Sequence, residues 1–224
     1  MSTDLQHQIS ELQEAYSPLS QINVVEEETV ISGPLCFSST PDGLENICEI
    51  FNIELHVPNN YTTCLPCIIE TDGRIGKDFH HLNDDGTLCL AVPMEARRIF
   101  QENPSLLGFI DKLVVPYLYG YCYWYKHGKM PFDEAQHGAS GIIEYYKDVF
   151  NPQIKDRDFI RALYNIYRYG YRGHHPCPCG SGKIIRKCHS VEVKQLSDNV
   201  YRTDLTHDLL AIFELYNRFK TVEI

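Results

Sequence analysis

The sequence predicts an α+β fold in which an antiparallel meander sheet packs with helices and a small helical appendage follows at the C-terminus. Short runs with strand-like alternation occupy the first seventy residues, whereas helical spacing of apolar residues dominates from residue 104 onward. At 224 residues the chain can hold one domain of about 150 residues and a smaller second region. We therefore place a domain boundary after residue 150, with a first domain over 1–150 and a helical tail over 151–224.

Hydrophobic periodicity predicts the first elements in chain order. Leu5, Ile9 and Leu12 recur at helical spacing before Pro18, which predicts an N-terminal helix. Strand-like runs follow at 24–35 and 47–57, with the turn Pro41-Asp42-Gly43 between them. A third strand at Ile68 and Ile69 ends at Thr71-Asp72-Gly73. Three consecutive strands joined by short turns predict an antiparallel meander.

Residues 104–125 contain two competing patterns. Tyrosines stand at alternate positions from 117 to 125, a period typical of a strand, but Leu106, Phe109, Ile110 and Leu113 hold a helical stripe. We predict a helix here. Further helices are expected around 142–149, 159–166 and 205–216, and no internal repeat is present.

Four soft metal ligands gather within thirteen positions of the tail. Cys177, Cys179, Cys188 and His189 provide three thiols and one imidazole, and glycines at 180 and 182 let the chain turn between them. Lys183, Arg186 and Lys187 lie beside a centre that three thiolates would make negative. His174 or His175 can replace His189 as the fourth ligand, but adjacency to Cys188 favours His189. The spacing predicts a structural Zn²⁺ site.

These ligands resemble the SEC-C motif, which occurs in bacterial accessory segments. The resemblance implies that the tail binds zinc and supports interactions with partners, so a catalytic metal is not expected. Because the tail is too short for a core of its own, we expect it to depend on zinc for stability.

Composition excludes several classes of function. The formal charge of −10 and a pI near 5.4 argue against a nucleic-acid binder that works by general electrostatics, so the expected partners are proteins. No apolar run approaches twenty residues, and we expect no membrane partner. Nine cysteines without a signal peptide indicate a reducing compartment, which predicts a cytoplasmic protein.

Cys89 stands out among the six cysteines that the metal motif does not use. It follows a polar, glycine-containing loop and stands between Leu88 and Leu90, a setting that favours a nucleophile over a packed core thiol. Cys64-Leu-Pro-Cys67 has redox-type spacing without the strand-then-helix setting, so it is interpreted as structural. Cys36, Cys48 and Cys122 lie in apolar stretches and are expected to pack in the core.

The segment around Cys89 resembles the ubiquitin-conjugating enzyme family. The resemblance lies in the order of helix, three-strand meander and loop, in Tyr61 with Leu65-Pro66, and in the two segments His81-Leu82-Asn83 and Gly86-Thr87-Leu88-Cys89-Leu90. It covers about residues 1–150 and is closest to the divergent bacterial branch associated with antiphage defence. The chain departs from the family pattern at Leu82, where proline is usual, in a loop shorter by about two residues, and at Thr62-Thr63-Cys64.

The resemblance implies a transferase that carries a ubiquitin-like protein as a thioester on Cys89 and passes it to a lysine of a target protein. Its implied partners are a ubiquitin-like protein, a cognate activating enzyme and the target. Asn83 is implied to hold the loop or stabilise the oxyanion, and His81, or His80 in its place, is the implied family histidine.

His137 is a further candidate that could tune the Cys89 thiol or deprotonate the lysine, although a capping or core histidine explains it as well. Asp84 and Asp85 are interpreted as solvated turn residues. Two alternatives stay open for the whole chain: an inactive binder of a ubiquitin-like protein, and a zinc-dependent adaptor whose main function lies in the tail.

Overall fold

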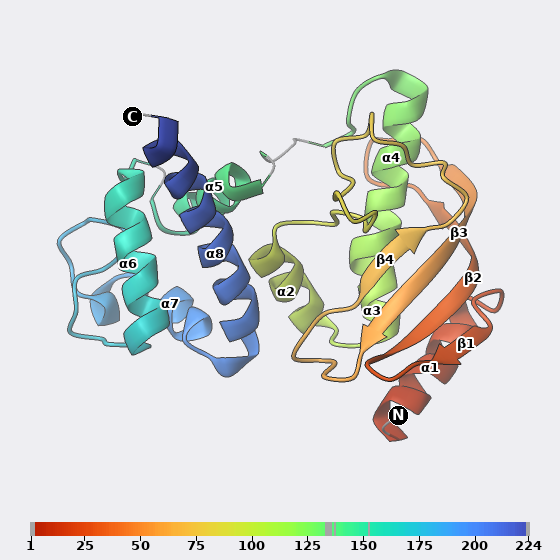
Figure 1. The fold of residues 1–224 in the computed structure, drawn as a ribbon, viewed down its shortest axis with the longest axis horizontal. Helices are drawn as coiled ribbons and strands as arrows, with labels where there is room; N and C mark the ends of the chain where they lie inside the picture. The colour runs from red at the N-terminus through yellow and green to blue at the C-terminus, as the bar shows by residue number, and fades with distance from the viewer. Residues whose placement is uncertain (1–2, 133–135, 137, 152, 223–224) are drawn as a thin grey trace. The chain divides into compact units, whose positions relative to one another are not determined.

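The computed structural model describes residues 3–132, 136, 138–151 and 153–222 (Figure 1). Contacts divide the chain into two units, one formed by Met1–Ala91 with Arg98–Glu134 and the other by Val92–Arg97 with Ala135–Ile224. Each unit has its own hydrophobic core. The domain boundary expected after residue 150 stays a prediction.

The first unit is an α+β structure built on a four-stranded antiparallel meander. Its strands pair in the order β1-β2-β3-β4. The strands are β1 (Gln21–Val24), β2 (Glu28–Ser39), β3 (Ile47–Pro58) and β4 (Cys67–Glu70). The helices are α1 (Thr3–Ala15), α2 (Pro93–Glu102), α3 (Leu106–Phe109), the π-helical segment η1 (Ile110–Val114) and α4 (Val115–His127). Helix α2 is divided between the units, because its residues up to Arg97 belong to the second unit.

The meander and the N-terminal helix confirm the predicted fold class, but the predicted number of strands is wrong. The run at 24–35 contains a hairpin, because β1 ends at Val24 and β2 begins at Glu28. The Val25 N–H donates to the Glu28 carbonyl at 3.0 Å and closes this turn. Two adjacent valines made the run look continuous, whereas the glutamates that follow them occupy the turn.

Strand alternation places one face of the sheet in the core. Leu35, Phe51, Ile53 and Leu55 are each at most 1% exposed. The Phe51 ring meets Tyr121 of α4 edge to face, with centroids 6.0 Å apart. Helix α4 therefore covers this face of the sheet (Figure 1).

The opposite face of β2 and β3 is directed to solvent. Cys36 and Cys48 alternate with buried neighbours and are exposed, so the expectation that they pack in the core is wrong. Cys122 is only partly buried. The apolar residues around Cys36 and Cys48 are buried because strand side chains alternate between faces, and the cysteines occupy the other positions.

The segment after α2 is helical, as the apolar stripe predicts. The Ser105 hydroxyl accepts a hydrogen bond from the Gly108 N–H at 3.0 Å and caps α3, after which η1 and α4 continue the helical path. Tyr117, Tyr119 and Tyr121 are buried, whereas Tyr125 is 76% exposed. The alternating tyrosines thus lie on different faces of a helix, and their spacing of two residues does not indicate a strand here.

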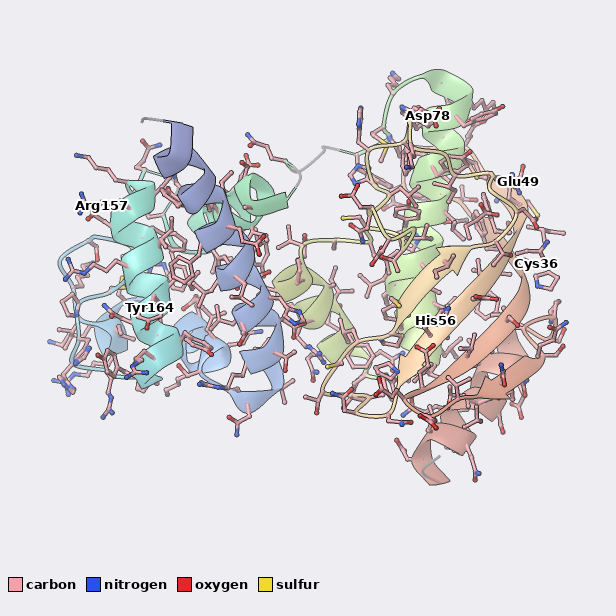
Figure 2. All side chains as sticks on the ribbon, in the orientation of Figure 1. Cys36, Glu49, His56, Asp78, Arg157 and Tyr164 are labelled. Carbon is pink, nitrogen blue, oxygen red and sulfur yellow. The ribbon has the colours of Figure 1, made fainter. Side chains whose placement is uncertain are left out.

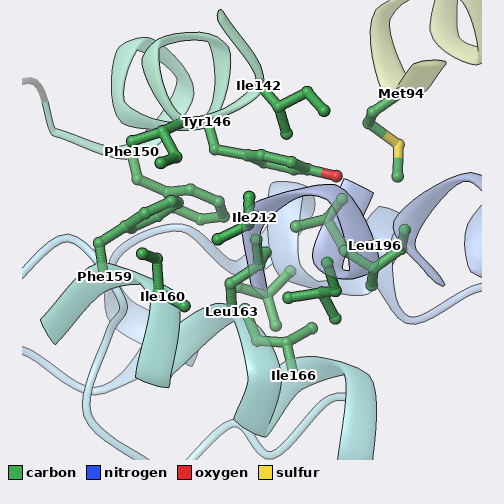
Figure 3. Packing of buried hydrophobic residues seen from close by; sticks show 14 of the residues in the cluster. Met94, Ile142, Tyr146, Phe150, Phe159, Ile160, Leu163, Ile166, Leu196 and Ile212 are labelled. Atoms are coloured by element: carbon green, nitrogen blue, oxygen red, sulfur yellow. The ribbon is translucent and has the colours of Figure 1, made fainter. Parts of the chain in front are cut away.

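The second unit is helical in its described residues. Its elements are α5 (Gly138–Phe150), α6 (Asp156–Tyr169), the 3₁₀ turn η2 (Ile185–Lys187), α7 (Ser190–Leu196) and α8 (Asn199–Val222). Tyr146, Phe159, Leu163 and Ile212 are fully buried at its centre (Figure 3).

This core extends beyond the predicted tail of residues 151–224. Helix α5 contributes Ile142, Tyr146 and Phe150, and Met94 of α2 packs into the same cluster. The apolar residues that complete the core therefore come from segments outside 151–224. Among the described residues of both units, no helix combines the length and the apolar character that a membrane span needs.

Candidate functional site

The four predicted metal ligands lie in a compact loop between α6 and α7. The Cys177 N–H donates to the Lys183 carbonyl at 2.8 Å, and an antiparallel bridge pairs Pro176 with Ile184. Gly180 and Gly182 turn the chain between these paired residues with φ values of 72° and 75°, which glycine adopts without steric cost. This turn, which we call the knuckle (residues 176–184), places Cys177 and Cys179 close together.

The ligand atoms converge at distances that suit one metal ion. Cys177 Sγ lies 3.2 Å from His189 Nδ1, Cys188 Sγ lies 3.3 Å from the same nitrogen, and the Cys179 and Cys188 sulfurs are 3.5 Å apart. All four ligand atoms lie within 4.8 Å of one another. Bond lengths of about 2.3 Å to sulfur and about 2.0 Å to nitrogen give tetrahedron edges of about 3.5–3.8 Å. The group can therefore hold a metal ion with little movement.

His189 belongs to this group, whereas the alternative ligands His174 and His175 do not. The two alternatives are exposed and their rings pack against each other, with centroids 4.7 Å apart. The His189 ring instead packs edge to face against Phe150 of the second core at 5.4 Å. Packing against the core thus fixes the histidine that follows Cys188.

The thiols are in contrasting electrostatic environments. Burial raises the pKa of Cys177 to about 12. Burial also raises the pKa of Cys179, but hydrogen bonding with Ser181, whose hydroxyl lies 3.1 Å from the sulfur, outweighs it and lowers this pKa to about 6. Ser181 therefore stabilises one thiolate, the form of cysteine that binds a metal. The sequence motif contains Ser181, but its role as a hydrogen-bond partner was not predicted.

Cys89 lies on a loop that joins β4 to α2 and pairs with the end of the sheet. The Leu88 N–H donates to the Ile68 carbonyl at 2.9 Å, and a bridge pairs Thr87 with Ile69. One residue further on, the Cys89 N–H donates to the His81 carbonyl at 2.8 Å. The main chain at Cys89 and at the residue before it is thus held by hydrogen bonds.

Tyr117 of α4 fixes the same carbonyl from the other side. Its hydroxyl donates to the His81 carbonyl at 2.9 Å, so Tyr117 and the Cys89 N–H share one acceptor. Burial, followed by proximity to Cys89, raises the pKa of Tyr117. Sequence reasoning missed this residue because its partner stands 36 positions away and nothing distinguishes it within the tyrosine run.

The predicted helper residues occupy different environments. Asn83 is exposed, and its side-chain amide donates to the Thr87 hydroxyl at 2.9 Å, within its own loop. His81 is half-buried with its ring 5.3 Å from Phe79, whereas His80 is exposed. Asp84 and Asp85 are exposed, and Asp85 accepts from the Thr87 N–H. His137 lies outside the described residues.

The Cys89 thiol is partly exposed, and burial raises its pKa. Cys89 in this conformation is therefore predominantly a thiol at neutral pH. A cavity of about 510 Å³ lies elsewhere in the first unit, between the start of β3 and the end of α4, and Cys89 does not line it. Its lining includes Glu49, Arg74 and Tyr121.

Comparison with known proteins leaves the structure as the sole guide to family. The chain matches no protein-family model, no curated protein and no solved structure. The molecule is an α+β protein with a four-stranded antiparallel sheet and a C-terminal Cys₃His cluster.

Proposed function

We propose that Cys89 carries the C-terminal acyl group of a ubiquitin-like protein as a thioester and transfers it to a lysine of a target protein. The observation that carries the proposal is the fixed loop around a partly exposed cysteine, held by the His81 carbonyl and by β4. The order of helix, antiparallel meander, cysteine loop and helix is the order that the family resemblance implies. Such a reaction would belong to antiphage defence.

The two half-reactions need only one sulfur atom. The Cys89 sulfur attacks the carbonyl of a thioester on the activating enzyme, a new C–S bond forms, and the enzyme's cysteine leaves and takes up the proton. The lysine nitrogen then attacks the Cys89 thioester, a C–N bond forms, and the Cys89 thiolate leaves and is reprotonated. Because the pKa of Cys89 is raised, a base must remove its proton as the first bond forms.

A second candidate function is noncovalent binding of a ubiquitin-like protein without a thioester. Two observations favour this alternative. The raised pKa of Cys89 makes its thiol a weaker nucleophile at neutral pH, and Cys89 does not line the cavity between β3 and α4. The two functions differ in one measurable product, the thioester itself.

We propose further that zinc occupies the Cys177, Cys179, Cys188 and His189 group as a structural ion. Three thiolates and one imidazole with no open position form a donor set that Zn²⁺ prefers. The ion would tie the knuckle to η2 and α7 and so stabilise the surface that the tail presents to a partner. In the adaptor alternative, this surface is the main functional part of the protein.

Thioester formation is tested by incubating the full chain with ATP, a bacterial activating enzyme and its ubiquitin-like protein. The expected result is an adduct that thiol reagents release and that Cys89→Ala does not form. Cys89→Ser should form an oxygen ester that resists thiols. Cys67→Ala removes an exposed cysteine of the same unit and should leave the adduct unchanged.

Two results contradict the transferase proposal: wild type forms no adduct, or Cys89→Ala forms as much as wild type. Copurification of the ubiquitin-like protein with Cys89→Ala, without any adduct on wild type, would establish the binding function.

The zinc assignment is tested by metal analysis of purified protein. Wild type should contain about one equivalent of zinc, and the Cys177→Ser, Cys179→Ser double variant should lose it. The matched control is Cys64→Ser, Cys67→Ser, which removes two cysteines outside the ligand group and should retain the metal. A full equivalent in the first variant would refute the ligand assignment.

A further inference from the structure

Positive charge is concentrated in one stretch of an otherwise acidic chain. Residues 157–187 contain seven arginines and lysines and a single acid, Asp158, although the whole chain has a formal charge of −10. The rest of the chain is correspondingly more acidic. The net charge of the chain is therefore the sum of a positive region, residues 157–187, and a negative remainder.

Helix α6 presents part of this charge as a stripe. Arg157, Arg161, Tyr164 and Arg168 follow one another at intervals of four, three and four residues, which places them on one face of the helix. All four are exposed, and the opposite face buries Phe159, Leu163 and Ile166. Figure 2 shows Arg157 and Tyr164 along this helix. The stripe spans about 17 Å at the ordinary rise of an α-helix.

The arginines of the stripe are not paired with any carboxylate in the part of the chain that the structure describes. Among the described residues, the guanidinium groups of Arg157, Arg161 and Arg168 make no ion pair, whereas other cations of the same unit do. Lys147, for example, meets Asp156 at 2.8 Å. Asp158 is the one acid between residues 157 and 187, and it forms no ion pair with these arginines among the described residues. Three like charges on one helix face repel one another, so an external anion would relieve this repulsion.

The metal-binding loop continues the basic sequence where α6 ends. Arg172, Lys183, Arg186 and Lys187 are exposed there. The loop positions them through its own main chain, because the Lys183 carbonyl accepts from Cys177 and the Arg186 N–H donates to Gly173 at 3.0 Å. We call the α6 stripe and these four residues the basic surface.

We infer that the basic surface binds single-stranded nucleic acid, a partner beyond the proposed transfer reaction. Arginine, which supplies all three cations of the stripe, suits phosphate because its planar fork donates two parallel hydrogen bonds. Tyr164 stands between the arginines with 40% of its surface exposed, and an exposed aromatic ring among cations is a platform for an unpaired base. An acidic protein could also pair with the arginines, but it would not need the exposed ring of Tyr164 between them.

The test measures fluorescence anisotropy of a labelled single-stranded oligonucleotide with the zinc-loaded full chain at several salt concentrations. Wild type should bind at 50 mM salt and weaken as salt rises. The Arg157→Gln, Arg161→Gln, Arg168→Gln variant should bind at least about tenfold more weakly and lower the salt slope by about two, the value expected for three phosphate contacts. Zinc content and helical circular dichroism establish that the variant is folded.

Two matched variants separate this surface from general charge effects. Lys77→Gln, Lys112→Gln, Lys129→Gln removes the same charge from exposed positions of the first unit and should leave affinity within about twofold. Tyr164→Ala should weaken binding by about fivefold or more, whereas Tyr164→Phe should retain it.

The proposal is overturned if wild type does not bind at 50 mM salt, or if the lysine control weakens binding as much as the arginine variant. It is also overturned if polyglutamate of equal charge competes as well as unlabelled oligonucleotide, a result that would assign the surface to an acidic protein. None of these results depends on the Cys89 reaction.

Discussion

Gly33 shows how one position can constrain the chain far from it in sequence. It lies within β2 with φ of 142°, a conformation that residues with a side chain rarely adopt. A Cβ built there would overlap the carbonyl oxygen of Pro18, in the segment between α1 and β1. Glycine is therefore required both by the backbone angle and by the close passage of a second segment.

We predict that Gly33→Ala lowers the free energy of unfolding of the first unit by at least about 2 kcal/mol, because strain and overlap add. Gly43→Ala is the control, since Gly43 also has a positive φ of 76° but open space around it, and it should cost about 1 kcal/mol. Urea unfolding followed by the fluorescence of Trp124, in the same unit, compares the two. Equal losses would show that overlap with Pro18 contributes nothing.

Contacts between individual residues can be predicted from the sequence where the two partners are close together in the chain. The four metal ligands lie within thirteen positions, so their spacing alone indicates that they converge. Tyr117 and the His81 carbonyl, by contrast, are joined only by the packing of α4 against the Cys89 loop. No local pattern encodes such a contact.

Helix α8 has a polar face inside the second core. Asp204 accepts from the Arg97 Nε at 2.6 Å, and the Tyr146 hydroxyl donates to Asp208 at 2.7 Å. The other carboxylate oxygen of Asp208 is buried and has no hydrogen-bond partner among the described residues. Burial, which hydrogen bonding with Tyr146 only partly offsets, raises the pKa of Asp208 to about 7.

This carboxyl should make the second unit less stable as pH rises. Unfolded aspartate has a pKa near 4, so between about pH 4 and 7 the folded state holds a proton that the unfolded state has released. The free energy of unfolding should fall through this window and level off above it, by roughly a few kcal/mol. In Asp208→Asn, which keeps an acceptor for Tyr146, the part of this fall that Asp208 contributes should disappear, whereas the part that Asp204 contributes should remain, because burial also raises the pKa of Asp204.

Urea denaturation followed by circular dichroism from pH 5 to 8 measures the dependence. Exposed Asp158→Asn is the control and should keep the wild-type slope. An Asp208→Asn profile parallel to wild type would mean that Asp208 is ionised in the folded protein throughout.

Helices could be predicted from the sequence where apolar residues recur at helical spacing over a long, uninterrupted run. The apolar stripes of α1, of α3 with η1, of α6 and of α8 predict helices that the structure contains. The β1–β2 hairpin was missed because its turn interrupts a short apolar run by only a few residues. Sequence periodicity also failed to indicate which face of β2 meets the core, so the exposure of Cys36 was not foreseen.

The whole molecule consists of two units with separate cores, and the metal group belongs to only one of them. Sequence reasoning expected the helical tail to depend on its metal. Because the second core also contains α5 and Met94, apolar burial contributes to its stability in addition to any contribution from a metal ion. The composition of the second core could not be predicted from residues 151–224 alone, because α5 and Met94 lie outside that range.

Removal of the metal should therefore loosen the second unit without unfolding the first. We predict that a strong zinc chelator increases hydrogen exchange in peptides covering residues 172–196 and leaves peptides of β2 and β3 protected. Trp124 fluorescence should stay unchanged, because Trp124 belongs to the first unit. Chelation that unfolds both units together would contradict their independence, and chelation without effect would mean that the ion contributes no stability.

The pairing of the Cys89 loop with β4 has a consequence for solubility. Thr87 and Leu88 occupy hydrogen-bonding groups of β4 that would otherwise be open at that edge of the sheet, and the opposite edge is β1, a strand of only four residues. Open strand edges recruit other chains, and short or covered edges suppress such aggregation. The loop that holds the candidate nucleophile thus also covers an edge of the sheet that could otherwise pair with another chain, so variants that loosen it must be checked for self-association before a loss of activity is assigned to chemistry.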